Sequence, residues 1–560
     1  MPGLEVLKFG SSVLRSPRDL YIAVDEVYRH WRIGRRVLAV VSAFEGITDQ
    51  LIAEAGDALG DPCPEATAAY VATGEQRTAA LLSGSLQRSG LPARIVDPRE
   101  IRLVAEGAFT ESTPARVDLA ALAQLWDAYP ILVLPGFYGI DSTGRIMLFG
   151  RGGSDLSALF LAAALGAECR LSKDVMGVYD ADPASTRLAH RFSALSWEKA
   201  VEVAGPLIQP KALQYAQSHG LTFSVGRPNE APCTRVGHTH DEWASPQRPS
   251  TPLRIALVGC GTVGRGVHQS IERYRQAFDL RCVVVKEVER YEDIGQVTSD
   301  SSVVLNPDID VVVICTPSTP TTYPLIAAAL SAGKFVITAN KAVVASHGAS
   351  LAAHIRSVHR RLYYSAAVGG ALPALETLAA LTQPIREIRG ILNGTCGVVL
   401  DEWASGKTRD EAVAVAQAAG YAEANPHGDL SGRDSADKLI LITEAAFGQW
   451  LTHDDIPTVG IDGISGDPRG YKLIARVKRD ARGISACVAP EVPPPHSFLG
   501  QARGPENRLE IELVSGEVIC LRGQGAGRWP TTVSIMGDLH EVARIVGADD
   551  FTQPPRTGVS

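Results

Sequence analysis

A single non-periodic stretch, residues 227–252, separates two long parts that show the same alternation of apolar runs and helical patterns. The stretch is rich in Pro, Ser, Thr and charge, which is typical of a linker. Before it, residues 1–226 alternate apolar runs, as at 37–42 and 131–135, with amphipathic helices. After it, RIALVG, CVVV, DVVVICT and KFVITAN are apolar throughout, as parallel strands buried on both faces are. The sequence therefore predicts an α/β protein in two parts.

Composition argues against several classes of function. The 560 residues have a net charge of −8, so the whole chain predicts no basic face for nucleic acid. No run of about 18 apolar residues lacks charges or breakers, and the start lacks the regions of a signal peptide. The nine cysteines are scattered without a CxxC pair, as reduced thiols are. We expect a cytoplasmic protein that binds neither nucleic acid nor membrane.

Three motifs in the first part place charges beside small residues. Lys8 ends an apolar run and precedes FGSS, where main-chain N–H groups can approach a phosphate. The run GRGGSD, residues 150–155, precedes a helix, and glycines at a helix N-terminus form an anion site. In it, Arg151 is suited to bind a carboxylate, and Asp155 to hold a metal or position a nucleophile. The third motif, KDVMGVY at 173–179, offers a ring and polar groups to a nucleotide.

In this order the motifs resemble the amino acid kinase family, and aspartate kinase most closely. The matching segments are residues 8–12, 41–49, 74–75, 136–137, 150–155 and 209–212. The resemblance implies a three-layer fold, in which Lys8 stabilises the transferring phosphoryl group and Asp155 organises the catalytic centre. It implies four residues at or near the bound aspartate: Ser42, Thr48, Glu75 and Arg151. It implies three contacts to ATP, which carries Mg²⁺: Asp174, Tyr179 and Lys211.

Two departures from the family concern the phosphates. Ser11 and Ser12 replace Gly-Thr, and Ala184 stands where the family has an arginine, with Arg187 following. These changes favour an alternative in which the kinase-like half is a binding or dimerisation module. A further alternative is a kinase for another amino acid, such as glutamate.

In the second part, RIALVG leads into GCGTVG, residues 259–264, and into an amphipathic helix predicted over 263–278. Between a strand and a helix, this motif is typical of dinucleotide binding, with the pyrophosphate at the helix N-terminus. The next strand is predicted to end at Val285-Lys286-Glu287, where an acid favours NAD and a base favours NADP. Both cofactors stay open, although Arg290 favours NADP slightly. The predicted cofactor-binding residues are Gly259, Gly261, Thr262, Val263, Gly264, Lys286, Thr316 and Lys341.

Polar residues farther along the second part form a second constellation. Lys341 ends the run TANK after a strand, where ligands bind in such sheets. Farther on, Asp434 and Lys438 are spaced i, i+4 and share one helix face. The helix continues as LILITEAAF, which is buried by pattern. We therefore expect this pair to face a pocket rather than form a surface salt bridge.

These residues resemble homoserine dehydrogenase. The matching segments are residues 259–264, 338–341, 390–395, 420–423, 429–438 and 523–531. The resemblance implies interconversion of aspartate semialdehyde and homoserine, with Lys341 and Lys438 as catalytic groups. It implies that three acids bind the amino group of homoserine and order the lysines: Glu423, Asp429 and Asp434. It implies a monovalent cation, Na⁺ or K⁺, held by main-chain carbonyls near Val368, Gly370 and Leu372.

Together the two resemblances predict a bifunctional enzyme of amino-acid biosynthesis, and they favour aspartate as the kinase substrate because both reactions then lie on one route. The paired ligand-sensing domains usual in such enzymes are expected to be absent, because the gap between the two patterns is too short for them. We also expect a homo-oligomer, dimer or tetramer. The predicted organisation is a kinase-like domain 1–226, a linker 227–252, a Rossmann domain 253–365, an α+β catalytic and dimerisation domain 366–540, and a tail 541–560.

Overall fold

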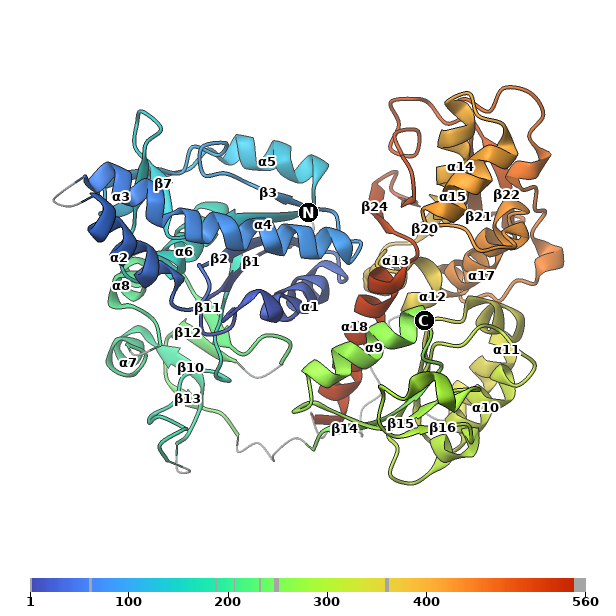
Figure 1. The fold of residues 1–560 in the computed structure, drawn as a ribbon, viewed down its shortest axis with the longest axis horizontal. Helices are drawn as coiled ribbons and strands as arrows, with labels where there is room; N and C mark the ends of the chain where they lie inside the picture. Colours follow the sequence, from blue (N-terminus) through green and yellow to red (C-terminus); the bar gives the residue numbers. More distant parts are fainter. Residues whose placement is uncertain are drawn as a thin grey trace. The chain divides into compact units, whose positions relative to one another are not determined.

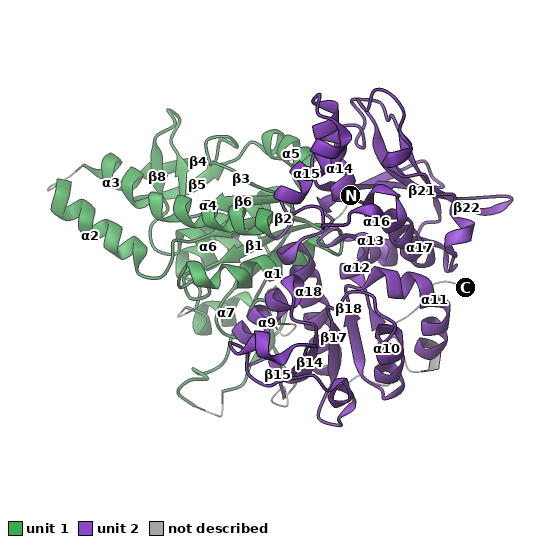
Figure 2. Ribbon diagram, turned by 45° about the vertical axis from the view of Figure 1, so that its right-hand side comes forward, with its two compact units in different colours: residues 1–88, 92–249 green, residues 89–91, 250–560 purple. Residues whose placement is uncertain are grey.

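The computed structural model describes residues 3–59, 63–186, 189–205, 207–230, 233–245, 251–357 and 362–547. The chain forms two compact units (Figures 1 and 2). Unit 1 contains residues 1–88 and 92–249, and unit 2 contains residues 89–91 and 250–560. No helix in the described ranges is both long enough and apolar enough to span a membrane.

The centre of unit 1 is a nine-stranded sheet with the order β13-β10-β12-β11-β9-β1-β2-β6-β3. Its middle strands run parallel, and their side chains are buried on both faces, which explains their apolar sequences. The register pairs Lys8 of β1 with Val40 of β2 and Leu171 of β9, so the carboxyl ends of these strands meet at one edge. The strands are β1 Leu4–Phe9, β2 Arg36–Val41, β3 Ala93–Ile95, β6 Ile131–Pro135, β9 Glu168–Ser172, β10 Phe192–Ser196, β11 Phe223–Gly226, β12 Thr234–His238 and β13 Glu242–Trp243.

Helices cover both faces of this sheet. On one face α1 and α4 pack on β2, and on the other α6 packs on β1 and β9 and against α8. All residues of α6 from Gly153 to Ala162 are buried, so this helix is central to the core. The predicted three-layer fold is confirmed. The helices are α1 Leu20–Trp31, α2 Ile47–Leu59, α3 Pro64–Val71, α4 Thr73–Arg88, α5 Leu119–Ala128, α6 Gly153–Leu165, α7 Trp197–Val203 and α8 Pro210–Ser218.

A second, four-stranded sheet of unit 1 has the order β5-β4-β7-β8. Its strands are β4 Val104–Ala108, β5 Glu111–Arg116, β7 Tyr138–Ile140 and β8 Ile146–Leu148. Tyr138 and Leu148 pack with α3 residues in a small apolar cluster of their own. This sheet carries Glu111 and ends beside the glycine-rich run at 150–153.

The predicted linker over residues 227–252 is wrong in part, because β12 and β13 lie within it. β12 pairs with β10 and β11 inside the large sheet, and β13 pairs with the outer edge of β10. Thr234 is fully buried and donates a hydrogen bond to the main-chain oxygen of Phe192 at 2.6 Å. Only Thr234 and Val236 of β12 face the core. Two buried positions are too few to give a visible alternation in the sequence.

The first layer of unit 2 is a six-stranded parallel sheet with the order β16-β15-β14-β17-β18-β19. The predicted helix over 263–278 ends earlier, at Arg273, because Phe278 already pairs with Leu253 at the start of β15. The strands are β14 Leu253–Val258, β15 Phe278–Val284, β16 Val297–Thr298, β17 Val311–Ile314, β18 Phe335–Thr338 and β19 Leu362–Tyr363. The helices are α9 Thr262–Arg273, α10 Thr322–Ser331 and α11 Lys341–Ser357.

The remainder of unit 2 contains a five-stranded antiparallel sheet, with the order β22-β21-β20-β23-β24, and a group of helices. The strands are β20 Ile385–Ile391, β21 Lys472–Asp480, β22 Gly483–Glu491, β23 Glu506–Leu513 and β24 Val518–Gln524. The helices are α12 Ser365–Gly369, α13 Ala374–Ala380, α14 Gly394–Ala404, α15 Arg409–Ala418, α16 His427–Leu430, α17 Arg433–Phe447 and α18 Arg528–Gly547.

Helix α18 does not follow the predicted domain boundaries. It continues past residue 540 to Gly547, and four of its residues, Ile535, Met536, Leu539 and Val542, join the core of the parallel sheet. It packs directly on α9, where a Cβ at Gly266 would lie 2.3 Å from the Thr532 hydroxyl. The nucleotide-binding core therefore includes a helix that follows the catalytic segment in sequence.

Candidate active sites

In unit 1, one buried carboxylate joins two lysines. The Lys8 ammonium lies 2.7 Å from Asp155 Oδ1, and Lys173 donates a hydrogen bond of 2.9 Å to Asp155 Oδ2. All three side chains are buried. Burial, opposed by Asp155 and reinforced by Lys173, lowers the pKa of Lys8. Burial works against the ionised form of Asp155, but the two lysines outweigh it and lower the pKa of this carboxyl to about 2.

Asp155 lies in the first turn of α6, which the chain enters through a glycine-rich loop. Gly150 and the N-cap Gly152 have φ of +73° and +76°, the left-handed region that favours glycine. A Cβ at Gly152 would lie 2.3 Å from the Gln209 side chain. The helix N-terminus lies beside Lys8, the penultimate residue of β1, because Lys8 binds Asp155 in the first turn of α6. Main-chain N–H groups at a helix N-terminus, together with a lysine, fit a phosphate. Arg151 is exposed beside them.

The residues predicted to bind aspartate gather beyond Lys8. Glu75, in the first turn of α4, accepts a hydrogen bond of 3.0 Å from the Ala43 N–H, next to Ser42. Thr48 stands in the first turn of α2, which packs against the start of α4 near Gly74. Burial raises the pKa of Glu75 to about 7, against the opposing effects of the Ala43 N–H and Lys8. The site therefore holds an acid that titrates near neutrality.

The residues predicted to contact ATP follow Lys173, the second partner of Asp155, along the chain. Asp174 is exposed, and its main-chain oxygen accepts two hydrogen bonds from Arg227. Tyr179 is half-buried and pairs with Arg191 through a β-bridge. Lys211 donates hydrogen bonds to Glu111 and to the main-chain oxygen of Phe149, beside Gly150.

Ala184, which replaces an arginine of the family, is exposed. Its main-chain N–H donates a hydrogen bond to Asp182. Arg187 lies outside the described residues. Lys173 is the cation that the sequence interpretation left without a role.

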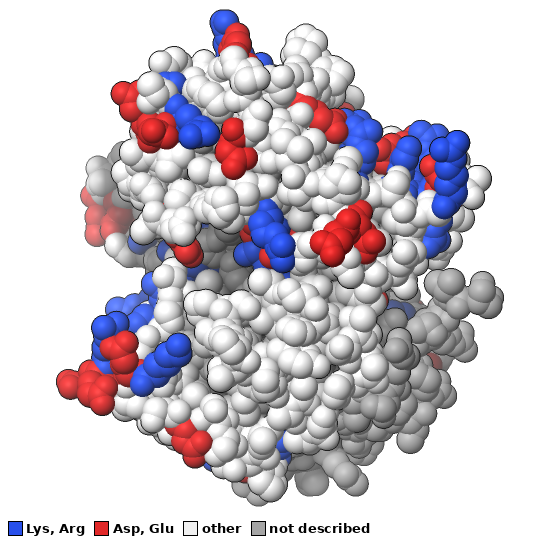
Figure 3. Space-filling model, turned by 90° about the vertical axis from the view of Figure 1, so that its right-hand side faces the viewer, with Lys and Arg blue, Asp and Glu red and all other residues white. Residues whose placement is uncertain are grey.

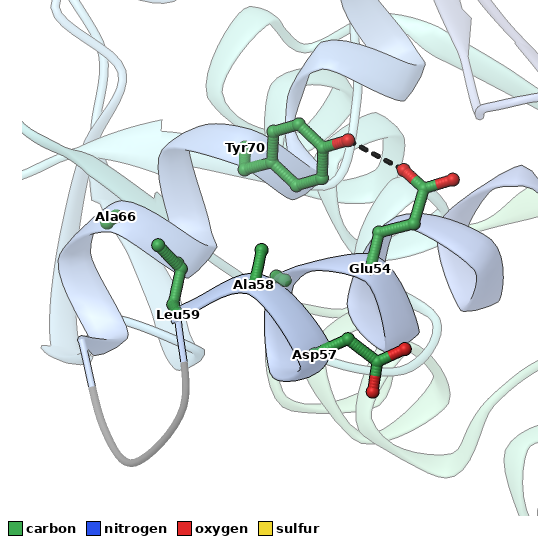
Figure 4. Close-up of a pocket in the computed structure, with 7 residues that line it drawn as sticks. Glu54, Asp57, Ala58, Leu59, Ala66 and Tyr70 are labelled. Atoms are coloured by element: carbon green, nitrogen blue, oxygen red, sulfur yellow. Dashed lines mark hydrogen bonds between the residues drawn. The ribbon is translucent and has the colours of Figure 1, made fainter.

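A surface hollow of about 750 Å³ in unit 1 lies apart from these groups. Figure 4 shows it between α2 and α3, with the Tyr70 hydroxyl donating a hydrogen bond to Glu54. Its lining is Glu54, Ala55, Asp57, Ala58, Leu59, Ala66 and Tyr70. None of the residues predicted to bind aspartate or ATP contributes to it, so the chemistry is better located at the lysine–carboxylate cluster.

In unit 2, the glycine motif has the geometry that a dinucleotide loop requires. Gly259 has φ of +87°, and a Cβ there would lie 2.7 Å from Thr316. A Cβ at Gly264 would lie 2.1 Å from the main-chain oxygen of Gly259, so only glycine permits this approach of α9 to β14. Gly261 is the N-cap of α9, and Thr262 and Val263 form its first turn. These residues fit a dinucleotide pyrophosphate.

A hollow of about 430 Å³ beside this loop is basic. Three arginines line it together with Tyr291 and the glycine loop: Arg265, Arg290 and Arg528. Arg290 was anticipated from sequence, whereas Arg265 and Arg528 were not. Lys286 is exposed and does not line the hollow. The three arginines each have one acidic or amide partner, respectively Asp293, Glu287 and Gln269.

A second carboxylate bridges two lysines in unit 2. Lys341 Nζ lies 2.9 Å from Asp434 Oδ1, and Lys438 Nζ lies 2.9 Å from Asp434 Oδ2. Lys438 is buried and also donates a hydrogen bond to the main-chain oxygen of Leu392, whereas the Lys341 side chain is 36% exposed. Asp434, against the effect of burial, raises the pKa of Lys341. Asp434 and Lys438 thus pair with each other inside a buried polar cluster that includes Lys341, and their facing a pocket stays a prediction.

Two asparagines that the sequence interpretation gave no role complete this cluster. Asn393 donates hydrogen bonds to Asp429 at 2.7 Å and to Asp434 at 2.9 Å. Asn507, fully buried on β23, donates to the same Leu392 oxygen as Lys438. Burial and the neighbouring Asp434 raise the pKa of Asp429. The asparagine spacings carry no sequence signal, because the strands that align them are far apart in the chain.

Two other predictions receive less support from the geometry. The Glu423 side chain is exposed, and its described hydrogen bond is made by its main-chain oxygen with Gln417. Of the three residues expected to hold a monovalent cation, Leu372 uses its main-chain oxygen to accept the Ala374 N–H. Val368 is the fourth residue of α12, and Gly370, with φ of +56°, follows that helix.

Charge on the surface is mixed where Figure 3 draws it. Lysines and arginines stand next to aspartates and glutamates on this face, and uncharged side chains cover wide areas between them. A single-sign patch is not visible on the described residues of this face.

The fold and the two sites define two classes of enzyme in one chain, a phosphotransferase and a dinucleotide-dependent oxidoreductase. Residues 3–225 match the amino acid kinase family, residues 259–365 the homoserine dehydrogenase NAD binding domain, and residues 373–540 homoserine dehydrogenase. The chain therefore belongs to the homoserine dehydrogenase family, with a unit of the amino acid kinase family fused before it.

Individual relatives agree with this assignment. A homoserine dehydrogenase of Pseudomonas aeruginosa is 31% identical over 54% of this chain and 75% of its own length. An aspartokinase of the same organism is 33% identical over 40% of this chain but only 55% of its own length. The crystal structure of a homoserine dehydrogenase from Thiobacillus denitrificans is similar with a TM-score of 0.51 and 29% identity, covering 55% of this chain and 76% of that one.

Proposed function

We propose that the chain catalyses two reactions: ATP-dependent phosphorylation of L-aspartate to 4-aspartyl phosphate, and NAD(P)-dependent interconversion of aspartate semialdehyde and homoserine. The observation that supports both is the same in each unit. An aspartate in the first turn of a buried helix holds two lysines at a site where strands end. The nine cysteines are free thiols, which supports a cytoplasmic setting.

In the kinase reaction, a side-chain carboxylate oxygen of aspartate attacks the γ-phosphorus of ATP, and the bond to the β-phosphate oxygen breaks. Glu75 in its ionised form receives the substrate amino group, and Arg151 the α-carboxylate. Lys8 and the N–H groups of residues 150–152 hold the transferring group, which is the main contribution that a protein makes to this chemistry. Magnesium, bound with the nucleotide, would neutralise part of its phosphate charge. Asp155 already binds a lysine at each of its two oxygens, so it fits a positioning role better than a metal-ligand role.

In the dehydrogenase reaction, a nicotinamide bound along the 259–264 loop supplies or accepts the hydride. During reduction, the aldehyde oxygen gains a proton from Lys341, whose raised pKa keeps it charged at neutral pH. Lys438, held by Asp434 and Leu392, orients the bridging carboxylate and supports a positive field at the substrate oxygen. Asp429, ordered by Asn393, is placed to receive the substrate amino group.

We infer that the dehydrogenase prefers NADP to NAD. The support is the basic hollow beside the glycine loop, where three arginines surround the position expected for the ribose. Guanidinium groups bind phosphate through paired hydrogen bonds, and a 2′-hydroxyl has no charge to offset them. Arg290 and Arg265 are paired with acids, which a 2′-phosphate would have to displace.

The decisive experiment measures acyl phosphate trapped by hydroxylamine when the full chain is given magnesium-ATP and a panel of amino acids, alongside homoserine-dependent reduction of NADP. We expect trapped product with aspartate but not with glutamate, and loss of aspartate use in Arg151→Ala with the dehydrogenase unchanged. If no amino acid gives product at saturating ATP while homoserine is oxidised, the first unit is a binding or dimerisation module.

A further inference from the structure

Lys173 is a buried cation for which the proposed roles leave no task. It follows directly after β9, and its main-chain N–H donates a hydrogen bond of 3.0 Å to Gly226 on β11, which fixes its backbone. Its side chain reaches back to Asp155 and is 9% exposed. Since β9 lies beside β1 in parallel register, Lys173 and Lys8 leave the sheet at the same edge.

The charges of this cluster do not balance. Asp155 carries one negative charge, whereas Lys8 and Lys173 together carry two positive charges when both are protonated. The next acid, Glu75, has a pKa of about 7 and so is only partly ionised near neutrality. A structural ion pair needs one lysine for one carboxylate, and an excess buried cation is costly without an anion. The cluster is therefore complete only when an anionic ligand is bound.

The positions of the two lysines assign them to different sides of that ligand. Lys8 interacts with Glu75 and lies on the side of the residues proposed to bind aspartate. Lys173 binds the opposite oxygen of Asp155 and adjoins Asp174 and the residues proposed to contact ATP. Both ammonium groups are bound to Asp155 in the first turn of α6, directly after the 150–153 loop. A phosphoryl group moving from nucleotide to aspartate would pass between the two ammonium groups.

We propose that Lys173 is a catalytic residue that contacts the β,γ-bridging oxygen of ATP and neutralises the charge that develops there as the phosphoryl group leaves. The proposal rests on phosphoryl transfer in unit 1. The aspartate carboxylate forms the new O–P bond, the bond between the γ-phosphorus and the bridging oxygen breaks, and its electron pair stays on ADP. Lys173 remains protonated throughout, so the step requires no further reactant. Lys8 acts on the incoming side, and Asp155 keeps both ammonium groups in place.

The test compares Lys173→Met and Lys173→Arg in the full chain, with Lys199→Met as a matched control. Lys199 pairs with Glu202 on the surface of α7. We measure kcat and the KM for ATP in acyl phosphate formation, the affinity for a non-hydrolysable ATP analogue with Mg²⁺, the thermal midpoint and the dehydrogenase rate. We expect Lys173→Met to lower kcat about 10²-fold or more, as loss of one preorganised donor does. Lys173→Arg should regain at least about tenfold of that loss, and Lys199→Met should match the wild type.

Every other outcome either supports or overturns the inference. If Lys173→Met keeps kcat within about threefold of wild type, Lys173 does not act on the leaving group. If Lys173→Met unfolds unit 1 while the dehydrogenase persists, and Lys173→Gln does the same, the residue has a structural role. If the wild type itself transfers no phosphoryl group, the proposed function fails separately. The analogue then reads Lys173 alone: weaker binding in Lys173→Met, restored by Lys173→Arg, keeps it as a phosphate contact, and unchanged binding removes it.

Discussion

The two units of this chain use the same charged arrangement for different chemistry. In each, a left-handed glycine, Gly152 or Gly432, begins a buried helix whose first turn carries an aspartate between two lysines. In unit 1 both lysines are buried, and the pKa of Lys8 is lowered. In unit 2 one lysine is partly exposed, and the pKa of Lys341 is raised. Burial of both cations suits a transferring anion, whereas one accessible cation suits a substrate oxygen that needs a proton.

The strongest test of this comparison exchanges the two bridging carboxylates for amides, one at a time. Asp155→Asn should lower aspartate phosphorylation by about 10³-fold and leave homoserine oxidation near wild type, because two buried lysines lose their common anion. Asp434→Asn should lower homoserine oxidation and leave aspartate phosphorylation near wild type. Asp127→Asn, a surface position beside Arg36, is the control. The measurement is the steady-state rate of each reaction in each variant. If either variant loses both rates, the two clusters are not independent.

The lysines of unit 2 should differ in the kind of defect they cause. Lys341→Met should lower kcat for homoserine oxidation by about 10²-fold or more, because the group that exchanges the proton is lost. Lys438→Met should lower kcat comparably and also lower the thermal midpoint, because Asp434 and the Leu392 oxygen each lose a buried charged partner. Kinetics and thermal unfolding distinguish them. Equal midpoints for the two variants would contradict the division of roles.

Acid should affect the kinase more than the dehydrogenase. Since the pKa of Glu75 is about 7, its ionised fraction falls as the pH falls, so kcat/KM for aspartate should decrease roughly 25-fold from pH 7.5 to 5.5. Glu75→Gln should remove this decrease at low pH, and its kcat/KM should be lower than that of the wild type at all pH values. Glu65→Gln, an exposed glutamate beside Arg145, should keep it. A pH profile for aspartate that is flat over this range would exclude Glu75 as the amino-group ligand.

The smallest effect should appear in cofactor choice. Arg290→Ala should raise the KM for NADPH about tenfold, equivalent to about 1.4 kcal/mol, and leave the KM for NADH unchanged, because only the former carries a 2′-phosphate. Kinase rates should stay at the wild-type value. Arg275→Ala, a surface arginine paired with Glu272, is the control. Equal changes in the KM for NADPH and NADH would show that the hollow does not contact the 2′-phosphate.

Sequence reasoning was most successful where burial leaves a periodic trace. The central strands are apolar because both of their faces are covered, and the helices at α15 and α17 keep a long amphipathic pattern. It failed at β12, where two core residues, Thr234 and Val236, give too short a pattern. It also failed at the end of α9. The apolar residues Tyr274 and Phe278 would fit the buried face of a longer helix as well as the turn that leads into β15.

The site predictions followed the same division. Residues inside contiguous motifs, such as Lys8, Asp155 and Asp434, could be singled out as candidates, and the structure places them in charged clusters. Lys173 was quoted within a motif but left without a role, because its meeting with Lys8 depends on the register of β1 and β9. Arg528 lies beside the glycine loop only because α18 returns to the parallel sheet. The spacing of residues within a short motif does not predict the register of strands or the contacts between segments that are far apart in the chain.

The return of α18 to the parallel sheet also has a consequence during protein synthesis. The strands of that sheet leave the ribosome roughly 160 residues before α18, whose residues Ile535, Met536 and Leu539 cover their apolar surface. At the usual pace of translation this interval is on the order of ten seconds or more. The nascent nucleotide-binding sheet is thus exposed to chaperones and to misassembly with neighbouring chains until the helix emerges, and the cofactor loop reaches its final packing only after α18 has been synthesised.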